Sequence, residues 1–306
     1  MLTRRSRPRT IGSLPMSQYD TTLDLSVSNT SHAQVVSLVP AGSDVLDVGC
    51  ATGYLAEALN QRGCTVSGVE YDAEAAEKAR PHLDHLVVGD LNTMDVDAAL
   101  GGRTFDVLVL ADVLEHVLDP VDVLRRLLPL LRPGGSVVMS IPNVAHGSLR
   151  LALLQGRWQY TDVGLLDRTH IRFFTRRSVL ELLADTGLAA AELRTTTRDP
   201  LTADVEIDAD ALPEGVVDWV RAQEDAMTFQ FVLRAVRDDA EASLGRAVAE
   251  REALRSEVAA LRRSAELAHA QRDAAVASLR EVQGTRAWRL LRVPRALYGK
   301  IRGGAR

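Results

Sequence analysis

Three acidic side chains, each directly after an apolar stretch, are the groups in this chain most able to hold a polar ligand. Glu70, Asp90 and Asp112 follow segments that are typical of strands. The carboxyl ends of parallel strands form the ligand crevice of an α/β sheet, so these acids should converge on one place. Glu70 stands about 20 residues after a glycine-containing turn, where a carboxylate can accept hydrogen bonds from both hydroxyls of a ribose. The spacing predicts a site for a nucleoside-containing cofactor.

The turn spans Gly49-Cys50-Ala51-Thr52-Gly53, between an apolar run and an amphipathic stretch. Glycine lets the backbone pass close to a ligand, and the helix that follows presents unpaired N–H groups. The turn lacks the full dinucleotide fingerprint, and such glycines also occur for structural reasons alone. Only its combination with the three acids favours a cofactor site.

Strands and helices are expected to alternate along most of the chain, which predicts a parallel, doubly wound α/β sheet. Helices are expected at 31–38, 53–61, 73–80, 94–100, 120–131 and 176–186. Strands are expected at 44–49, 65–70, 85–89, 105–110, 135–141, 189–197 and 228–236.

From about residue 31 to 237 the order of motifs resembles the class I S-adenosylmethionine-dependent methyltransferases. The resemblance rests on Val45–Gly53, Gly89-Asp90-Leu91, Ala111–Val117 and Leu131–Gly135. It implies a Rossmann-like sheet of seven strands, with the last strand inserted antiparallel, and S-adenosyl-L-methionine as the cofactor. Ala51 departs from the family pattern, in which many members have glycine; because its methyl group is small, we expect cofactor binding to survive.

The resemblance also implies roles for residues at the strand ends. Glu70 would hold the ribose, Asp90 the adenine amino group and Leu91 the adenine ring, while Gly49 and Asp112 would lie beside the methionine part. The complete implied cofactor set is Asp47, Gly49, Cys50, Ala51, Gly53, Glu70, Tyr71, Asp90, Leu91, Ala111 and Asp112.

Methyl transfer is an in-line displacement, for which a protein aligns the two reactants, excludes water and removes a proton from a hydroxyl acceptor. The candidate bases are His116 and His170, because an imidazole titrates near neutral pH. Either could instead be structural, His116 by packing in its loop and His170 by supporting Asp167. His32 and His146 are weaker candidates. No histidine and carboxylate grouping shows metal-ligand spacing in the sequence, so no metal is expected.

Acceptor binding is expected in segment 143–175, which is rich in aromatic and charged residues although the whole chain is only 4% aromatic. Either the segment is a lid whose polar groups contact the acceptor, or it is a packed connection with its charges in solvent. Its notable side chains are Trp158, Tyr160, Asp162, Asp167, Arg168, His170, Arg172, Phe173 and Phe174.

Composition limits the remaining possibilities. The chain has 306 residues, 46% hydrophobic, and a net charge of −5, which suits one sizeable core. Cys50 and Cys64 indicate neither a disulfide framework nor a zinc site, which suits a cytoplasmic protein. No apolar run reaches the roughly 20 residues of a membrane-spanning helix.

We expect four parts: a disordered basic leader (1–17), the methyltransferase domain (18–237), a coiled coil (238–284) and a basic amphipathic tail (285–306). Translation could start at Met1 or Met16. A heptad pattern over 244–282 favours self-association or a partner protein, with a single long helix as the alternative. The tail could contact the inner face of the membrane or simply be a frayed end. The acidic body argues against nucleic acid.

The tail looks like those of bacterial enzymes of surface-polysaccharide assembly, and segments Pro142–His146 and Leu165–Thr175 are similar to methyltransferases of that setting. The first expectation is therefore O-methylation of a glycan or lipid-linked sugar. One alternative is O-methylation of a small quinone-type or phenol-type molecule. Another is a non-catalytic interaction protein that binds the cofactor, against which the intact Glu70 and Asp90 argue.

Overall fold

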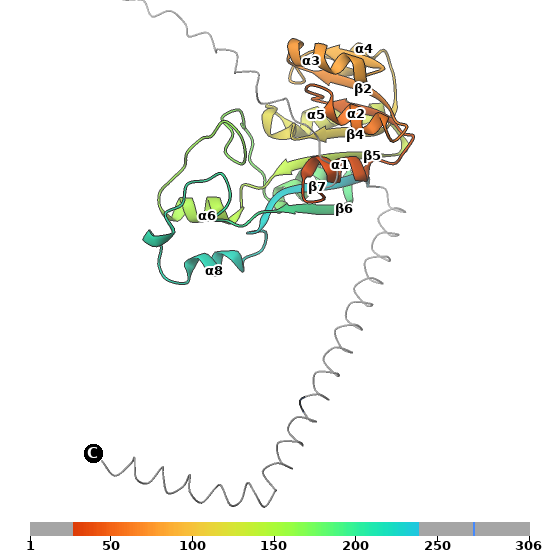
Figure 1. The fold of residues 1–306 in the computed structure, drawn as a ribbon. Coiled ribbons are helices and arrows are strands. Elements are labelled where there is room, and N and C mark those ends of the chain that lie inside the picture. The colour runs from red at the N-terminus through yellow and green to blue at the C-terminus, as the bar shows by residue number, and fades with distance from the viewer. Residues whose placement is uncertain (1–26, 239–271, 273–306) are drawn as a thin grey trace, which may run out of the picture. The chain divides into compact units, whose positions relative to one another are not determined.

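A computed structural model describes residues 27–238 and Arg272, and residues 27–238 contain one seven-stranded sheet (Figure 1). The strand order is β3-β2-β1-β4-β5-β7-β6, and β7 runs antiparallel to both of its neighbours. The expected antiparallel insertion of the last strand is confirmed. The strands are β1 Asp44–Val48, β2 Thr65–Glu70, β3 His85–Val88, β4 Phe105–Ala111, β5 Leu131–Pro142, β6 Leu188–Thr197 and β7 Thr228–Arg237.

Helices lie between the strands as the alternation predicts. They are α1 Ser31–Leu38, α2 Tyr54–Asn60, α3 Ala73–Ala79, α4 Val96–Leu100, α5 Pro120–Leu127, α6 Gly147–Leu154, α7 Arg176–Asp185 and α8 Val216–Arg221. Short 3-10 turns occur at Arg80–His82, Leu114–His116, Leu128–Leu130 and Ala209–Ala211. The helix expected over 120–131 was predicted too long: α5 ends at Leu127, because Pro129 cannot donate a backbone hydrogen bond.

The two faces of the sheet are covered by different helices, as strand alternation requires. On β4, Leu108 and Leu110 face a core that includes buried side chains of α5 and α7. Val107 and Val109 face a second core shared with α1 and α2. Because both faces are buried, β4 reads as a continuous apolar run in the sequence. Packing on both faces holds β4 in place, and with it the residues at its carboxyl end.

Two helices that the sequence did not predict, α6 and α8, pack together beyond β5, β7 and β6 (Figure 1). Leu151, Val220 and Ala226 are buried between them. The fully buried Asn143 ties this region to the start of β7, since its Nδ2 donates to the carbonyl oxygen of Thr228 at 2.8 Å. Part of the expected lid is therefore packed against the sheet edge.

The expected leader (1–17), coiled coil (238–284) and basic tail (285–306) lie outside the described residues, apart from Asp238 and Arg272. These three assignments stay predictions. In the part of the chain that the structure describes, every helix is too short or too polar to cross a bilayer.

Candidate functional site

The turn between β1 and α2 needs its glycines. Gly49 and Gly53 have φ values of +74° and +84°, a region that disfavours side chains. A Cβ at Gly53 would lie 2.8 Å from the Cα of Ala79, so no larger residue fits without displacing α3. Ala51 also adopts a positive φ of 47°. Whether cofactor binding tolerates this alanine stays a prediction.

The predicted ribose acid is held directly beside this turn. Glu70 accepts hydrogen bonds from the backbone N–H of Ala51 at 2.7 Å and of Asp72 at 2.8 Å. At the end of the next strand Asp90 accepts two hydrogen bonds from Asn92, from its backbone N–H and its side-chain amide, both at 2.8 Å. Glu70 and Asp90 are half-buried, so both carboxylates are oriented and still reachable from solvent.

Three further residues of the predicted cofactor set lie at the same edge of the sheet. Tyr71 follows β2 with 74% of its surface exposed, Leu91 is half-buried after β3, and Ala111 is buried at the end of β4. The carbonyl oxygen of Leu91 accepts a hydrogen bond from the Arg126 guanidinium at 2.5 Å. That contact fixes the backbone which was predicted to meet the adenine ring.

Asp47 has a buried carboxyl group at the carboxyl end of β1. It is 1% exposed, and neither carboxylate oxygen has a hydrogen-bond partner among the described residues. Burial, together with the nearby charge of Glu70, raises the pKa of Asp47 to about 7. Burial and the same two acids also raise the pKa of the Cys50 thiol far above its ordinary range. A buried acid of this kind is stabilised by a cationic ligand.

Asp112 is the meeting point of four elements. Its Oδ1 accepts hydrogen bonds from Ser140 of β5 and Gln230 of β7, each at 2.9 Å. Its Oδ2 lies 3.9 Å from Nε2 of His32 of α1, and that imidazole is 3.2 Å from the Tyr54 hydroxyl of α2. His32 therefore lies beside one of the predicted cofactor residues. Sequence analysis missed Ser140 and Gln230 because they are 28 and 118 residues from Asp112.

The two predicted catalytic histidines lie side by side. The rings of His116 and His170 have centroids 4.8 Å apart and meet edge to face. Nδ1 of His116 is 3.2 Å from the Thr169 carbonyl oxygen, and Nδ1 of His170 is 3.3 Å from that of Leu165. Burial lowers the pKa of His170, and the charge of His116 lowers it further. The pairing confirms neither catalytic role, and both roles remain predictions.

Glu115, to which the sequence analysis gave no role, lies in the 3-10 turn Leu114–His116 that follows β4. It is 1% exposed, and neither carboxylate oxygen has a hydrogen-bond partner among the described residues. Burial, then the charge of Asp112, raises its pKa well above the usual range. Its carbonyl oxygen accepts hydrogen bonds from the N–H groups of Ile171 and Arg172 at 2.9 and 3.0 Å. Segment 169–172 is thereby clamped against the end of β4.

The other histidine singled out from the sequence is structural. His146 is fully buried at the amino end of α6, with its Nδ1 2.8 Å from the Ser148 hydroxyl and its Nε2 2.9 Å from the Arg198 carbonyl oxygen. Burial lowers its pKa. Both ring nitrogens are occupied, so His146 has none left for chemistry.

The aromatic residues of segment 143–175 form a small exposed group. Trp158 contacts Phe173 and Tyr160 edge to face, with ring centroids 5.7 and 6.4 Å apart. Phe173 directly follows the clamped segment, so this aromatic group lies on the same connection as His170. Phe174 is instead buried in the core.

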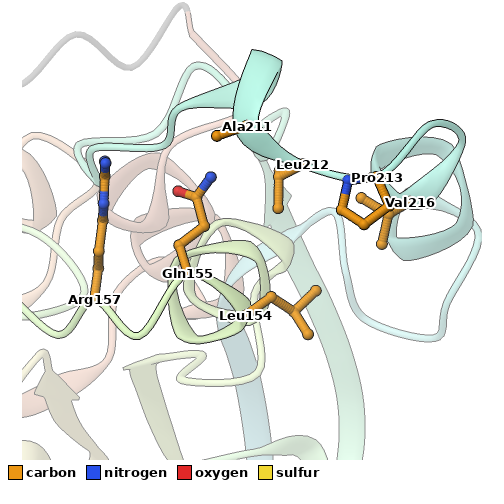
Figure 2. Close-up of a pocket in the computed structure, with 7 residues that line it drawn as sticks. All are labelled: Leu154, Gln155, Arg157, Ala211, Leu212, Pro213 and Val216. Carbon is orange, nitrogen blue, oxygen red and sulfur yellow. The ribbon is translucent and has the colours of Figure 1, made fainter.

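A surface pocket of about 420 Å³ opens between α6 and α8, lined by Leu154, Gln155, Arg157, Ala211, Leu212, Pro213 and Val216 (Figure 2). None of its lining residues belongs to the predicted cofactor set or to the histidine pair. We do not assign it to the methyl-transfer site.

Comparisons with known proteins identify the family of this chain. Residues 31–193 match the protein family described as Methyltransferase domain. The chain is 34% identical over 173 residues to the ubiquinone biosynthesis O-methyltransferase of Thiobacillus denitrificans, covering 56% of this chain and 75% of that protein. The protein of the same name from Stutzerimonas stutzeri is 34% identical over 180 residues, which again cover 56% of this chain and 75% of that protein. A solved SAM-dependent methyltransferase from Archaeoglobus fulgidus has 17% identity and a TM-score of 0.49, over 69% of this chain and 94% of that one.

The glycine turn and the three acids all fall inside the matched residues. The site also fits the cofactor, because oriented carboxylates stand at three strand ends and the unpartnered Asp47 supplies negative charge for a cationic amino acid part. The chain belongs to the methyltransferase domain family and is an S-adenosylmethionine-dependent methyltransferase.

Proposed function

We propose that the protein methylates a hydroxyl group of a small phenol-type or quinol-type molecule, which binds beside His116 and His170. The observation that carries this proposal is the placement of both imidazoles at the carboxyl end of β4, four residues beyond Asp112 in the case of His116. A donor held by Glu70, Asp90 and Asp112 would present its methyl group toward this end of the sheet.

The reaction needs little from the protein besides alignment and deprotonation. The sulfonium donor supplies an activated methyl group, and the acceptor oxygen must lose its proton to attack well. A phenol-type hydroxyl has a pKa of about 10, as in tyrosine, so about one molecule in a thousand is ionised at pH 7. Groups at the site that favour the ionised oxygen would therefore accelerate transfer strongly.

The relatives favour a phenolic acceptor over the sugar acceptor that was the first expectation from the sequence. Both of the relatives described above are named for ubiquinone biosynthesis. The exposed aromatic group of Trp158, Tyr160 and Phe173 offers ring faces to a planar acceptor. The contacts of a partner protein with 244–282 and of a membrane with 285–306 stay predictions, as does a cytoplasmic location.

The acceptor class can be tested with the purified full chain and donor labelled in its methyl group. We expect label in a prenylated dihydroxybenzene and none in a polyprenyl-linked sugar. Label in the sugar alone would contradict the phenolic acceptor. If the protein binds the donor but labels neither compound, O-methylation of both acceptor classes is wrong.

A variant series separates acceptor chemistry from donor binding. His116→Ala should lower turnover of the dihydroxybenzene and leave the calorimetric affinity for S-adenosylmethionine unchanged. Asp90→Ala should weaken donor binding. Unchanged turnover in His116→Ala would remove His116 from the acceptor site.

A further inference from the structure

In the part of the chain that the structure describes, the carboxyl group of Glu115 is buried without a hydrogen-bond partner, and only a cation beside it would stabilise its ionised form there. Burying an unpaired charge costs several kcal/mol, which buried acids normally recover from a basic side chain, hydrogen bonds or a metal ion. Among the described residues neither oxygen of Glu115 has a hydrogen-bond partner, and Nε2 of His170 lies 4.0 Å from its Oε1. Asp112 and Asp167 add further negative charge nearby.

Both imidazoles next to Glu115 are arranged as metal ligands. When Nδ1–H donates to a carbonyl oxygen, the lone pair is placed on Nε2, and such a second hydrogen bond is typical of metal-bound histidine. His116 has the Thr169 carbonyl oxygen at its Nδ1, and His170 has that of Leu165. This assignment of the ring protons leaves both Nε2 atoms as acceptors, and that of His170 lies 4.0 Å from the acid.

The three side chains are close enough to share one ion. One ligand atom each from Glu115, His116 and His170 lies within 4.8 Å of the other two. A point between three such atoms is at most about 2.8 Å from each, whereas zinc ligands stand at about 2.0–2.2 Å. Closure by well under 1 Å per atom, through side-chain rotation, would complete the coordination.

The surroundings of the cluster also suit a working metal centre. The backbone hydrogen bonds from Ile171 and Arg172 to the Glu115 carbonyl oxygen, at 2.9 and 3.0 Å, hold the segment that carries His170 against the turn that carries Glu115 and His116. His170 is 8% exposed in its side chain, whereas His116 is open to solvent. An ion could therefore enter past His116.

We infer that Glu115, His116 and His170 form a binding site for one divalent transition-metal ion of the zinc type. Two imidazoles and one carboxylate suit zinc, manganese or iron better than magnesium, which prefers oxygen ligands. Three protein ligands leave a position for an oxygen of another molecule, as in catalytic zinc sites. The one-residue and 54-residue separations within this set explain why no metal spacing was visible in the sequence.

What the ion does rests on the proposed function, whereas its binding does not. An acceptor hydroxyl bound to the ion would release its proton to water at neutral pH. The oxygen then forms the new O–C bond, the C–S bond breaks, and its electron pair stays on sulfur. In this arrangement His116 acts as a ligand, and the ion takes over the deprotonation for which an imidazole base was expected.

Binding is tested by isothermal titration of zinc chloride into the untagged full chain after treatment with a chelator. We expect one ion per chain, and binding at least about 100-fold weaker in Glu115→Gln and in His170→Ala, since loss of a second-shell contact alone costs 10–100-fold. His82→Ala, which removes a half-buried histidine outside the cluster, is the matched control and should bind like wild type. Equal zinc affinity in wild type and Glu115→Gln, or no binding at all, would overturn the site.

Two further measurements keep the test independent of folding defects and of the acceptor assignment. Zinc should raise the melting temperature of wild type and of His82→Ala but not that of Glu115→Gln, which keeps the shape of the side chain. Stoichiometric zinc binding without methylation of a dihydroxybenzene would refute the proposed function and leave the metal site standing. Full methylation by chelated, metal-free enzyme would refute the role of the ion and leave O-methylation standing.

Discussion

Replacing Asp47 by asparagine should change how the stability of the domain depends on pH. Asp47 is 1% exposed, has no hydrogen-bond partner among the described residues, and has its pKa raised from 3.8 to about 7. The unfolded chain releases this proton near pH 3.8, whereas the native protein keeps it until about pH 7. The stability contributed by the protonated group is therefore complete below about pH 4 and is lost as the pH rises to 7.

The size of the effect follows from the same two values. At about 1.4 kcal/mol per pKa unit, ionising Asp47 in the folded protein costs about 4 kcal/mol in total. About 3 kcal/mol of this should appear between pH 5 and pH 8. The side-chain amide of the Asp47→Asn variant is neutral at every pH, so any cost of leaving it unpaired is the same throughout. The stability of Asp47→Asn relative to wild type should therefore rise by about 3 kcal/mol across this window.

Urea unfolding of both proteins between pH 5 and pH 8 measures this change. Parallel pH profiles would refute the reasoning, because they would mean that Asp47 ionises equally in the native and the unfolded chain. Donor binding supplies an opposite readout. We expect Asp47→Asn to bind S-adenosylmethionine more weakly above pH 7, since the carboxylate no longer faces the cationic donor.

Other parts of the cofactor site give predictions of their own. Gly53→Ala should destabilise the domain by about 1–3 kcal/mol more than Gly63→Ala, because both glycines have positive φ but only Gly53 would place a Cβ against backbone; equal losses in urea unfolding would contradict this. Glu70→Gln should weaken donor binding by about 10-fold to 100-fold through loss of charged hydrogen bonds, and calorimetry would show whether affinity is instead retained. Cys50, buried and with its thiol pKa far above the ordinary range, should resist alkylation in the native protein; mass spectrometry after brief iodoacetamide treatment would reveal any early labelling.

Most of the sheet was predictable, because strands buried on both faces appear in the sequence as short apolar runs ended by an acid or a glycine. Helix ends were predicted less well: α5 stops before Pro129, and the helix was expected to continue past it. Helices α6 and α8 were missed. Leu151 of α6 and Val220 of α8 are buried in the same small hydrophobic cluster. The two residues are far apart in the sequence, so short-range periodicity does not reveal their contact.

The sequence by itself was enough to predict the residues that would hold the cofactor. Its turn and its acids are local features, since each acid directly follows the strand that positions it, and parallel strands bring their carboxyl ends together. Only the tertiary structure brought together Glu115, His116 and His170. Glu115 and His116 meet His170 because backbone hydrogen bonds from Ile171 and Arg172 fold segment 169–172 onto the end of β4. Such a contact depends on packing between segments that are distant in the sequence, so the spacing of residues along the chain does not predict it.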